Sequence, residues 1–189
     1  MRVSETSLPG VRRIEPEPRR DDRGFFVRVM SADLWAEAGI DHARFVQANQ
    51  SRSRHRTLRG LHLRAGPGEA KTVRCARGRI FDVVVDLRPA SPTFGRWERF
   101  ILDDDAHVQV YIPPGCAHGF QVLSADCDVC YLHDQFYEPG LDVAVAWDDP
   151  DIAVVWPLGD PILSERDRSA PPLTTLIPQL EAWFGAPGG

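Results

Sequence analysis

The sequence predicts an all-β fold, an antiparallel sandwich or barrel, from three observations. Short segments rich in Val, Ile, Phe, Tyr and Trp fill the centre of the chain and start roughly every 8–12 residues, the spacing of such folds. Clusters of Gly, Pro, Asp or Ser separate these segments. The 16 prolines and 15 glycines favour many turns over long helices. With 189 residues, 43% of them hydrophobic, the chain is long enough for one domain with a buried core.

The expected strands are short apolar or alternating runs bounded by turn residues. They cover residues 71–76, 79–87, 97–102, 107–112, 119–123, 128–133, 142–147 and 152–156. In the second of these, Asp82 and Asp86 stand at the two ends of three consecutive valines. An uninterrupted apolar run between charged ends suits a strand that is buried in the centre of a sheet.

Two short helices are expected outside the strands. Ser31 can cap a helix over residues 32–38, and Gly39 is a typical stop. Residues 173–184 are amphipathic, but we expect Pro178 to break that helix. Because the chain has no linker and no internal repeat, we expect one domain over residues 1–189, with residues 173–189 as its tail.

The net charge and the length of the apolar runs argue against two classes of binding partner, nucleic acids and membranes. The net charge of −5 argues against nucleic acid, which a basic surface would attract. The apolar runs are strand-sized, far from the ~20 residues that cross a bilayer, so we expect no membrane partner. The first ten residues lack the apolar core of a secretory signal, and we therefore expect a cytoplasmic protein.

The four cysteines are expected to be free thiols, as is usual in a reducing compartment. Cys127 and Cys130 have CxxC spacing, but they lie in an alternating run, where positions three apart point to opposite faces of a strand. A second CxxC is absent from the sequence, which argues against a zinc or redox site. We expect Cys116 to be a small core residue.

Residues 113–118 have the pattern P-x-G-x-x-H, which resembles the second signature of the cupin jelly roll. The first cupin signature supplies His-x-His and then a glutamate, and here those places hold His62, Arg64 and Glu69. Arginine offers no lone pair to a divalent metal. The pattern therefore resembles a cupin that has lost its metal, and we expect no metal and no cofactor. A three-ligand metal site of His62, Glu69 and His118 stays open as an alternative.

A longer series of motifs extends this resemblance over most of the chain. In order, they are FVQANQS at 45–51, TLRGLH at 57–62, FDVVVDLR at 81–88, SPTFGRW at 91–97, IPPGCAHGF at 112–120, WDDP at 147–150 and LSERD at 163–167. From about residue 23 to about residue 172, the chain resembles the dTDP-4-dehydrorhamnose 3,5-epimerase family, the RmlC-type deoxysugar epimerases. The resemblance implies a cupin-type antiparallel jelly roll (double-stranded β-helix), a homodimer and a nucleotide-sugar substrate. It also implies epimerisation of a 4-keto-6-deoxyhexose at C3 and C5 through an enolate.

The resemblance assigns four residues to the chemistry. His62 matches the family's general base, and an imidazole with a pKa near 6.5 suits proton abstraction at neutral pH. Asp167 matches the carboxylate that orients this histidine. Tyr131 matches the acid that reprotonates the opposite face. Lys71, the only lysine of the chain, lies where a cation would stabilise the enolate oxygen.

Each of these four residues also has a purely structural interpretation. His62 and Tyr131 could be core residues, and Tyr131 shares one strand face with Val129 and His133. Asp167 could cap a helix that starts near residue 164, and Lys71 could be a surface residue at a strand end. The TLRGLH context favours the functional role of His62, and we also expect the catalytic role for Tyr131.

The substrate-binding residues implied by the resemblance are more dispersed. They are Arg23, Arg28, Gln47, Asn49, Arg59, His118, Tyr137, Asp142 and Arg166. Arg23 and Arg59 suit the diphosphate, because a guanidinium pairs well with phosphate oxygens. Arg23 could equally sit in a solvated charged loop. Tyr137 matches the aromatic residue that stacks on the nucleotide base.

Five positions depart from the family pattern. Arg28 replaces a glutamate, Arg64 a glutamine, Leu132 a lysine, Asp142 a longer glutamate, and Arg166 a lysine. These changes leave open which nucleotide and sugar are bound. They also leave open a mono-epimerase that acts at C3 or C5 only, a metal-dependent cupin enzyme, and a sugar-nucleotide binder without catalysis.

Overall fold

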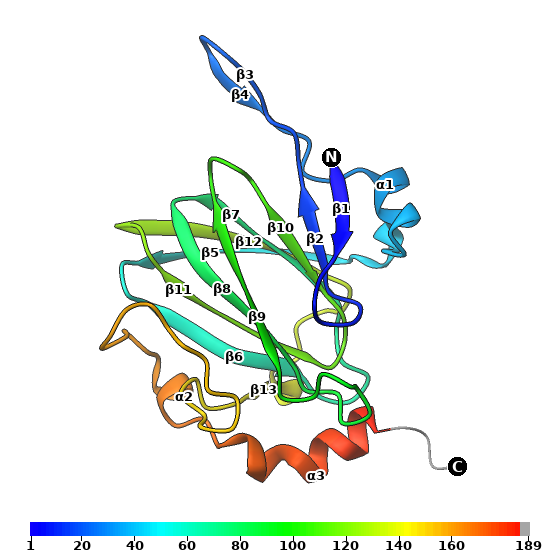
Figure 1. The fold of residues 1–189 in the computed structure, drawn as a ribbon, viewed down its shortest axis with the longest axis vertical. Helices are drawn as coiled ribbons and strands as arrows, with labels where there is room; N and C mark the ends of the chain where they lie inside the picture. The colour runs from blue at the N-terminus through cyan, green and yellow to red at the C-terminus, as the bar shows by residue number, and fades with distance from the viewer. Residues whose placement is uncertain (186–189) are drawn as a thin grey trace.

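The structure, a computed structural model, describes residues 1–185 and arranges most of them in two antiparallel sheets (Figure 1). The six-stranded sheet has the order β1 (Arg2–Glu5), β2 (Arg12–Glu15), β10 (Gln109–Ile112), β7 (Lys71–Arg77), β12 (Asp126–His133) and β5 (Gln47–Arg54). The five-stranded sheet has the order β13 (Asp142–Ala144), β6 (Leu58–Arg64), β11 (Cys116–Val122), β8 (Arg79–Asp86) and β9 (Trp97–Asp103). Neighbouring strands come from distant parts of the chain, and the expected cupin-type jelly roll is confirmed.

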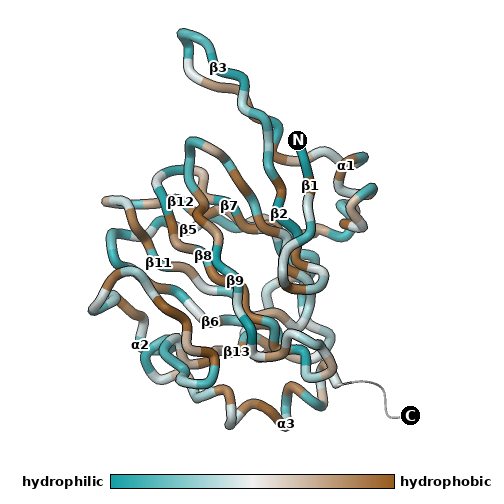
Figure 2. The backbone as a smooth tube through the Cα atoms, in the orientation of Figure 1, coloured by the Kyte–Doolittle hydropathy of each residue, from teal (hydrophilic) through white to brown (hydrophobic). Residues whose placement is uncertain are grey.

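The main core lies between the two sheets. Val73 of β7, Val129 of β12, Val84 of β8 and Phe120 of β11 belong to one buried cluster, so side chains of both sheets pack face to face. Figure 2 shows hydrophobic stretches along the central strands of the molecule. Burial of such side chains stabilises the fold by roughly 1.5–3 kcal/mol each.

Strand β8 is buried on both faces, as its sequence predicts. Val83 and Val85 point away from the main core and pack in a second cluster. Helix α3 (Leu173–Phe184) covers this outer face with Leu173, Leu176 and Leu180. The helix runs along the outside of the five-stranded sheet in Figure 1. Residues 186–189 of the expected tail lie outside the described residues.

The expected break at Pro178 is wrong, because α3 continues through this residue. A proline inside a helix costs about 3 kcal/mol, since it removes one backbone hydrogen bond. The burial of Leu173, Leu176 and Leu180 against the sheet offsets this cost. Local propensity is thus overridden by packing.

Two of the expected strands are also wrong or too long. Only Asp142–Ala144 (β13) of residues 142–147 is a strand, and residues 152–156 form no strand. The Asp149 carboxylate accepts hydrogen bonds from the backbone N–H groups of Asp151 and Ile152, and Ala153 has a φ of +53°. These contacts curl the segment into a turn, although Ile152 is buried as an apolar run predicts.

The strands that precede residue 71, β1 to β6, are not among those expected from the sequence. Strand β5 forms one edge of the six-stranded sheet and β6 lies inside the five-stranded sheet. Strand β5 is almost entirely polar and gives no apolar signal. Helix α1 (Ala32–Glu37) is confirmed, ending one residue earlier than expected before Gly39, whose φ is +76°. Ser31 occupies its N-cap position, but its hydroxyl donates to the Asp33 carboxylate instead of capping the backbone.

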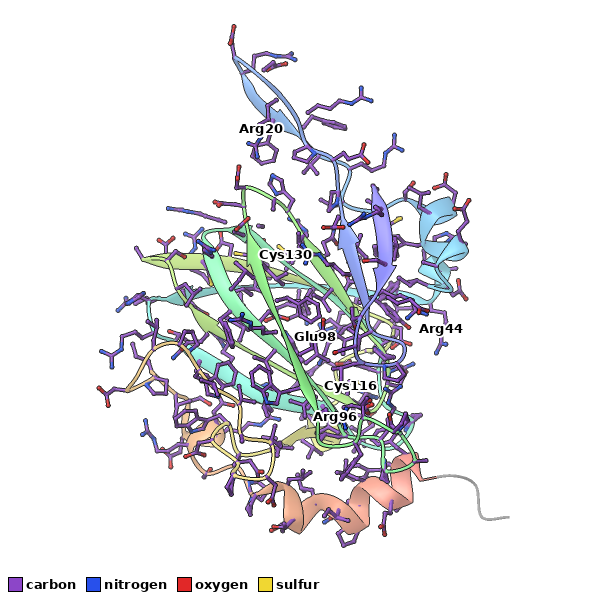
Figure 3. The ribbon with its side chains drawn as sticks, viewed as in Figure 1. Arg20, Arg44, Arg96, Glu98, Cys116 and Cys130 are labelled. Atoms are coloured by element: carbon purple, nitrogen blue, oxygen red, sulfur yellow. The ribbon has the colours of Figure 1, made fainter. Side chains whose placement is uncertain are left out.

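The cysteines occupy the expected environments. Cys127 is in the main core and Cys130 is partly exposed on the opposite face of β12, and all four cysteines are free. Burial raises the pKa of the Cys116 thiol to about 12, which suits an unreactive core residue. Figure 3 shows Cys116 and Cys130 well apart in the fold.

A two-stranded hairpin, β3 (Arg19–Asp21) and β4 (Gly24–Phe26), projects from the body of the molecule (Figure 1). Arg20, labelled in Figure 3, donates hydrogen bonds to the backbone oxygen and the carboxylate of Asp105 at the hairpin's base. Phe26 is 72% exposed on this hairpin. None of the helices within residues 1–185 is both long enough and apolar enough to span a membrane.

Strands β6 and β11 approach each other unusually closely at two glycines. A Cβ atom on Gly60 would lie 2.5 Å from the Gly119 Cα and 3.0 Å from the His118 carbonyl oxygen. Gly60 also has a φ of +133°, which disfavours any residue with a side chain. The register between these strands shifts at this point, directly beside the paired residues His62 and His118.

We predict that Gly60→Ala destabilises the protein by roughly 3 kcal/mol or more, because it combines backbone strain with a backbone clash. Gly140→Ala is the matched control, since a Cβ at Gly140 meets nothing within 4 Å. Urea unfolding would measure both variants. A Gly60→Ala protein as stable as the Gly140→Ala protein would contradict the packing described for these strands.

Candidate active site

A cavity of about 300 Å³ lies between the two sheets. Strands β5, β7 and β12 form one wall, and β6, β11 and β13 form the other. The predicted residues that line it are Gln47, Asn49, Arg59, His62, Lys71, His118, Tyr131, Tyr137 and Asp142. The fold thus gathers most of the predicted site from segments that are far apart in the sequence.

His62 projects from β6 and is held by a carboxylate behind it. Its Nε2 lies 2.5 Å from the Asp167 Oδ1, and Asp167 itself is nearly buried. Asp167 is not a helix cap, because Ser164 caps α2 (Glu165–Arg168) and its hydroxyl also donates to the Asp167 carboxylate. Burial acts to raise the pKa of Asp167, but its contact with His62 and the hydrogen bonds from Ser164 and the Gly60 backbone together outweigh it and hold that pKa below its usual value. This carboxylate stays ionised and fixes the imidazole.

His118, the cross-strand partner of His62, belongs to a second histidine–carboxylate pair. Its Nε2 lies 2.7 Å from the Oδ1 of Asp82, and both side chains are buried. The second oxygen of Asp82 has no hydrogen-bond partner among residues 1–185. The buried carboxylate that the sequence places at the start of the valine run thus anchors a histidine of the cavity wall.

Tyr131 lies on the opposite sheet, in β12. Its ring packs edge-on against His118, with ring centroids 6.2 Å apart, and stacks on His133 at 5.7 Å. Burial strongly raises the pKa of the Tyr131 hydroxyl, so that it remains protonated. A neutral phenol in this position is a proton donor.

Lys71 is only 7% exposed, which excludes its interpretation as a surface residue. Its Nζ lies 3.5 Å from the Oε1 of Glu69, whose other oxygen is 3.3 Å from the Nδ1 of His133. Burial acts to raise the pKa of Glu69, but His133 and Lys71 outweigh it and lower that pKa. Glu69 thus supplies a counter-charge beside the buried Lys71 side chain.

The segment that carries Tyr137 is fastened at the edge of the cavity. Arg64 donates hydrogen bonds to the Phe136 carbonyl oxygen at 3.0 Å and to the Glu138 carboxylate at 3.1 Å. The side-chain oxygen of Gln47 accepts a hydrogen bond from the Tyr137 backbone at 2.9 Å. The Tyr137 side chain is 63% exposed, so one ring face is free to stack on a planar group.

Some predicted residues do not reach this cavity. Arg166 is held at its edge through an ion pair with Asp142. Arg23 lies on the projecting hairpin, 90% exposed and paired with Asp21, and Arg28 lies just beyond the hairpin. Within one chain, Arg23 therefore has the environment of a solvated loop.

Sequence reasoning missed Glu69 and His133 as a pair in the cavity wall. Alternation did place His133 on the same strand face as Tyr131, and this signal could have found it. Glu69 appeared only as a candidate metal ligand, but Lys71 and His133 occupy its carboxylate. Within residues 1–185, no group of three His, Cys, Asp or Glu side chains is arranged to hold a metal ion.

The fold and the cavity together define a class of protein. A base candidate with an ionised partner faces a protonated phenol across the cavity, and a buried lysine lines the same cavity. A general base and a general acid on opposite walls of one cavity are typical of an enzyme that removes a proton from a substrate and returns one, an isomerase of the epimerase type.

Comparisons with known proteins agree with this class. The family described as dTDP-4-dehydrorhamnose 3,5-epimerase matches residues 5–175. The chain belongs to this family.

Individual relatives match nearly the whole chain. A dTDP-4-dehydrorhamnose 3,5-epimerase of Methanothermobacter thermautotrophicus is 45% identical over 175 residues, covering 91% of this chain and 94% of that protein. A dTDP-4-dehydrorhamnose 3-epimerase of Streptomyces niveus is 44% identical over 171 residues, covering 90% and 83%. The structure of RmlC from Legionella pneumophila in complex with dTDP-4-keto-L-rhamnose has a TM-score of 0.89 at 40% identity, covering 94% of this chain and 95% of that one.

The His62–Asp167 contact predicts a pH-dependent contribution to stability. Since the folded-state pKa of Asp167 is lowered, its stabilisation is complete above the unfolded pKa of about 3.9 and is lost as the pH falls through the folded pKa. We expect Asp167→Asn to cost about 1–2 kcal/mol near pH 7, and progressively less below about pH 4.

Urea unfolding at a series of pH values would measure this difference. Asp148→Asn is the control, because it makes the same change of side chain at an exposed aspartate. A cost for Asp167→Asn that stays constant from neutral to acidic pH would contradict an ionised, histidine-bound carboxylate.

Proposed function

We propose that the protein epimerises a dTDP-linked 4-keto-6-deoxyhexose at C3 and C5, in the biosynthesis of a deoxysugar. The observation that carries the proposal is the placement of His62 and Tyr131 on opposite walls of one cavity. Inversion at carbon requires a proton to leave one face and a proton to arrive at the other. The names of the relatives and the bound ligand of the Legionella structure support the substrate class.

The proposed reaction balances without a redox partner. His62 takes the proton from the carbon next to the ketone, and the C–H electron pair forms a C=C bond while the C4 oxygen becomes an enolate. The Lys71 ammonium stabilises that oxygen. Tyr131 then donates its proton to the opposite face of the carbon, and the C4 carbonyl forms again. Solvent returns a proton to the phenolate and takes one from His62.

The remaining cavity residues would hold the nucleotide. Arg59 offers a guanidinium for the diphosphate, and the exposed ring of Tyr137 offers a stacking surface for the base. We propose that Arg64 and Gln47 fix the Tyr137 segment for this purpose. Asp142 and Arg166, which pair with each other, would close the site from the side of β13.

A mono-epimerase is the second candidate function. The relative from Streptomyces niveus is a dTDP-4-dehydrorhamnose 3-epimerase, and it is 44% identical to this chain. The same base and acid would serve a single inversion, so the number of carbons inverted has to be measured.

The assembly and location are also proposals. We propose a homodimer, because Arg23 and Arg28 match substrate-binding positions but lie away from the cavity of their own chain, on or just beyond the projecting hairpin. A partner protomer would bring them to a cavity and would cover Phe26. We propose that the chain is one domain, and that it works in the cytoplasm, where four free thiols are usual.

Proton exchange with solvent tests the proposed reaction. The protein is incubated with dTDP-4-keto-6-deoxyglucose in D₂O, and the C3 and C5 signals are followed by proton NMR. We expect both signals to disappear with the unmodified protein, and coupling constants to report inversion. His62→Asn should lower the rate by about 10²–10⁴-fold, as loss of a general base does.

His42→Asn is the control variant, since His42 is exposed on the short helix His42–Arg44 and lies outside the cavity. Loss of one signal alone would favour the mono-epimerase. An active His62→Asn protein would overturn the base assignment, and the absence of exchange with the unmodified protein would overturn the proposed reaction.

Sedimentation analysis tests the homodimer. We expect the unmodified protein to sediment as a dimer, and Phe26→Asp to shift the equilibrium toward monomer because it places a charge on an apolar contact. Val155→Asp is the control, since Val155 is 73% exposed and lies far from the hairpin in sequence. A monomeric unmodified protein would contradict the homodimer.

A further inference from the structure

Glu69 and His133 lie outside the proposed catalytic set. Together they connect Tyr131, the proposed acid, to Lys71, the proposed cation. Their side chains are 16% and 14% exposed and both line the cavity. One carboxylate oxygen of Glu69 approaches the Lys71 ammonium at 3.5 Å, and the other approaches the His133 ring nitrogen at 3.3 Å. His133 and Lys71 are also direct partners across strands β12 and β7.

A carboxylate in this place needs an explanation. The cavity is proposed to bind a diphosphate and an enolate, both of which are negatively charged, and an unpaired carboxylate would repel them. Each oxygen of the Glu69 carboxylate contacts a neighbouring side chain, one Lys71 and the other His133. The carboxylate therefore orients these two side chains and does not face a ligand unpaired. Removing one partner of such a buried pair leaves the charge of the other uncompensated, which is destabilising.

His133 in turn limits where the Tyr131 ring can lie. The two rings are stacked, with centroids 5.7 Å apart and planes inclined by 24°. On another side, Tyr131 meets the edge of His118, which is bound to the buried Asp82. Tyr131 is therefore packed between two histidines, and a carboxylate fixes each of them.

We propose that Glu69 and His133 are positioning residues for the reprotonation step: the Glu69–His133 pair holds the Tyr131 ring, and Glu69 also orients Lys71. The proposal rests on the proposed function and deepens it. Neither residue transfers a proton to the substrate. Their role is to keep the phenol within reach of the carbon during the life of the enolate, where small displacements have large effects on rate.

This role predicts an uncoupling of two observables. When Tyr131 is misplaced, the enolate still forms at His62, and His62 can return a deuteron to the same face. Exchange with solvent then continues while inversion fails. A merely structural defect would instead lower exchange and inversion together.

Three substitutions separate the contributions. His133→Leu removes both the ring and the contact with Glu69. His133→Phe keeps a ring against Tyr131 and removes only the contact with Glu69. Glu69→Gln keeps the shape of the side chain but removes its charge. Glu37→Gln and His42→Leu are matched controls, since both residues are exposed and lie outside the cavity.

The experiment measures deuterium exchange and inversion at C3 and C5 in the same NMR sample, with dTDP-4-keto-6-deoxyglucose in D₂O. For His133→Leu we expect the ratio of exchange to inversion to rise about tenfold or more, as misplacing a catalytic group allows. For His133→Phe we expect a smaller rise in the ratio, of about threefold, because the ring against Tyr131 is kept and only its contact with Glu69 is lost. For Glu69→Gln we expect exchange to slow by about tenfold, since it depends on the lysine that stabilises the enolate. We also expect the ratio of exchange to inversion to rise by about threefold, as in His133→Phe, because the His133 ring loses the same charged contact.

Thermal unfolding checks that each variant is folded. If His133→Leu does not fold, His133→Gln serves in its place, because it has no ring and is predicted to raise the same ratio. Equal loss of exchange and inversion in folded His133→Leu or His133→Gln would overturn the proposal, as would an unchanged ratio. Absence of exchange in the unmodified protein is a different result, which would overturn the proposed function itself.

Discussion

The structure depends on one geometric constraint, that the base and the acid stand on opposite walls of a single cavity. His62 comes from the five-stranded sheet and Tyr131 from the six-stranded sheet, so the space between the sheets separates them. A sandwich provides such facing walls, because each sheet turns one face of side chains toward the other. The close approach of Gly60 and Gly119 fixes the strand that carries His62 against its neighbour.

The same kind of interaction, a histidine ring held by a carboxylate, recurs three times in the cavity walls. Three histidines point toward the site or its surroundings, and a carboxylate holds each: His62 with Asp167, His118 with Asp82, and His133 with Glu69. These carboxylates come from a helix, a central strand and a loop. Charge-assisted contacts of this kind are strong where water is excluded, and they restrict the rotation of the rings.

The sequence predicted an all-β sandwich or barrel from its strand-sized apolar runs. It predicted the jelly roll and most cavity residues through the family resemblance that motifs such as TLRGLH and P-x-G-x-x-H carry. It did not predict β5, whose polar residues face the cavity and therefore carry no apolar signal. The sequence wrongly predicted a helix break at Pro178, because the packing of three leucines offsets the free-energy cost of a proline inside the helix. The Glu69–His133 pair joins residues 64 positions apart, and only the pairing of β7 with β12 brings them together.

The most direct test of the opposed base and acid is solvent exchange by Tyr131→Phe in D₂O. This variant keeps the ring between His118 and His133 and removes only the hydroxyl group, and with it the proton that the phenol donates. The account predicts that deuterium still enters the carbons next to the ketone, while inversion falls by about 10²-fold or more. Inversion at the rate of the unmodified protein, or loss of exchange together with inversion in a folded variant, would contradict it.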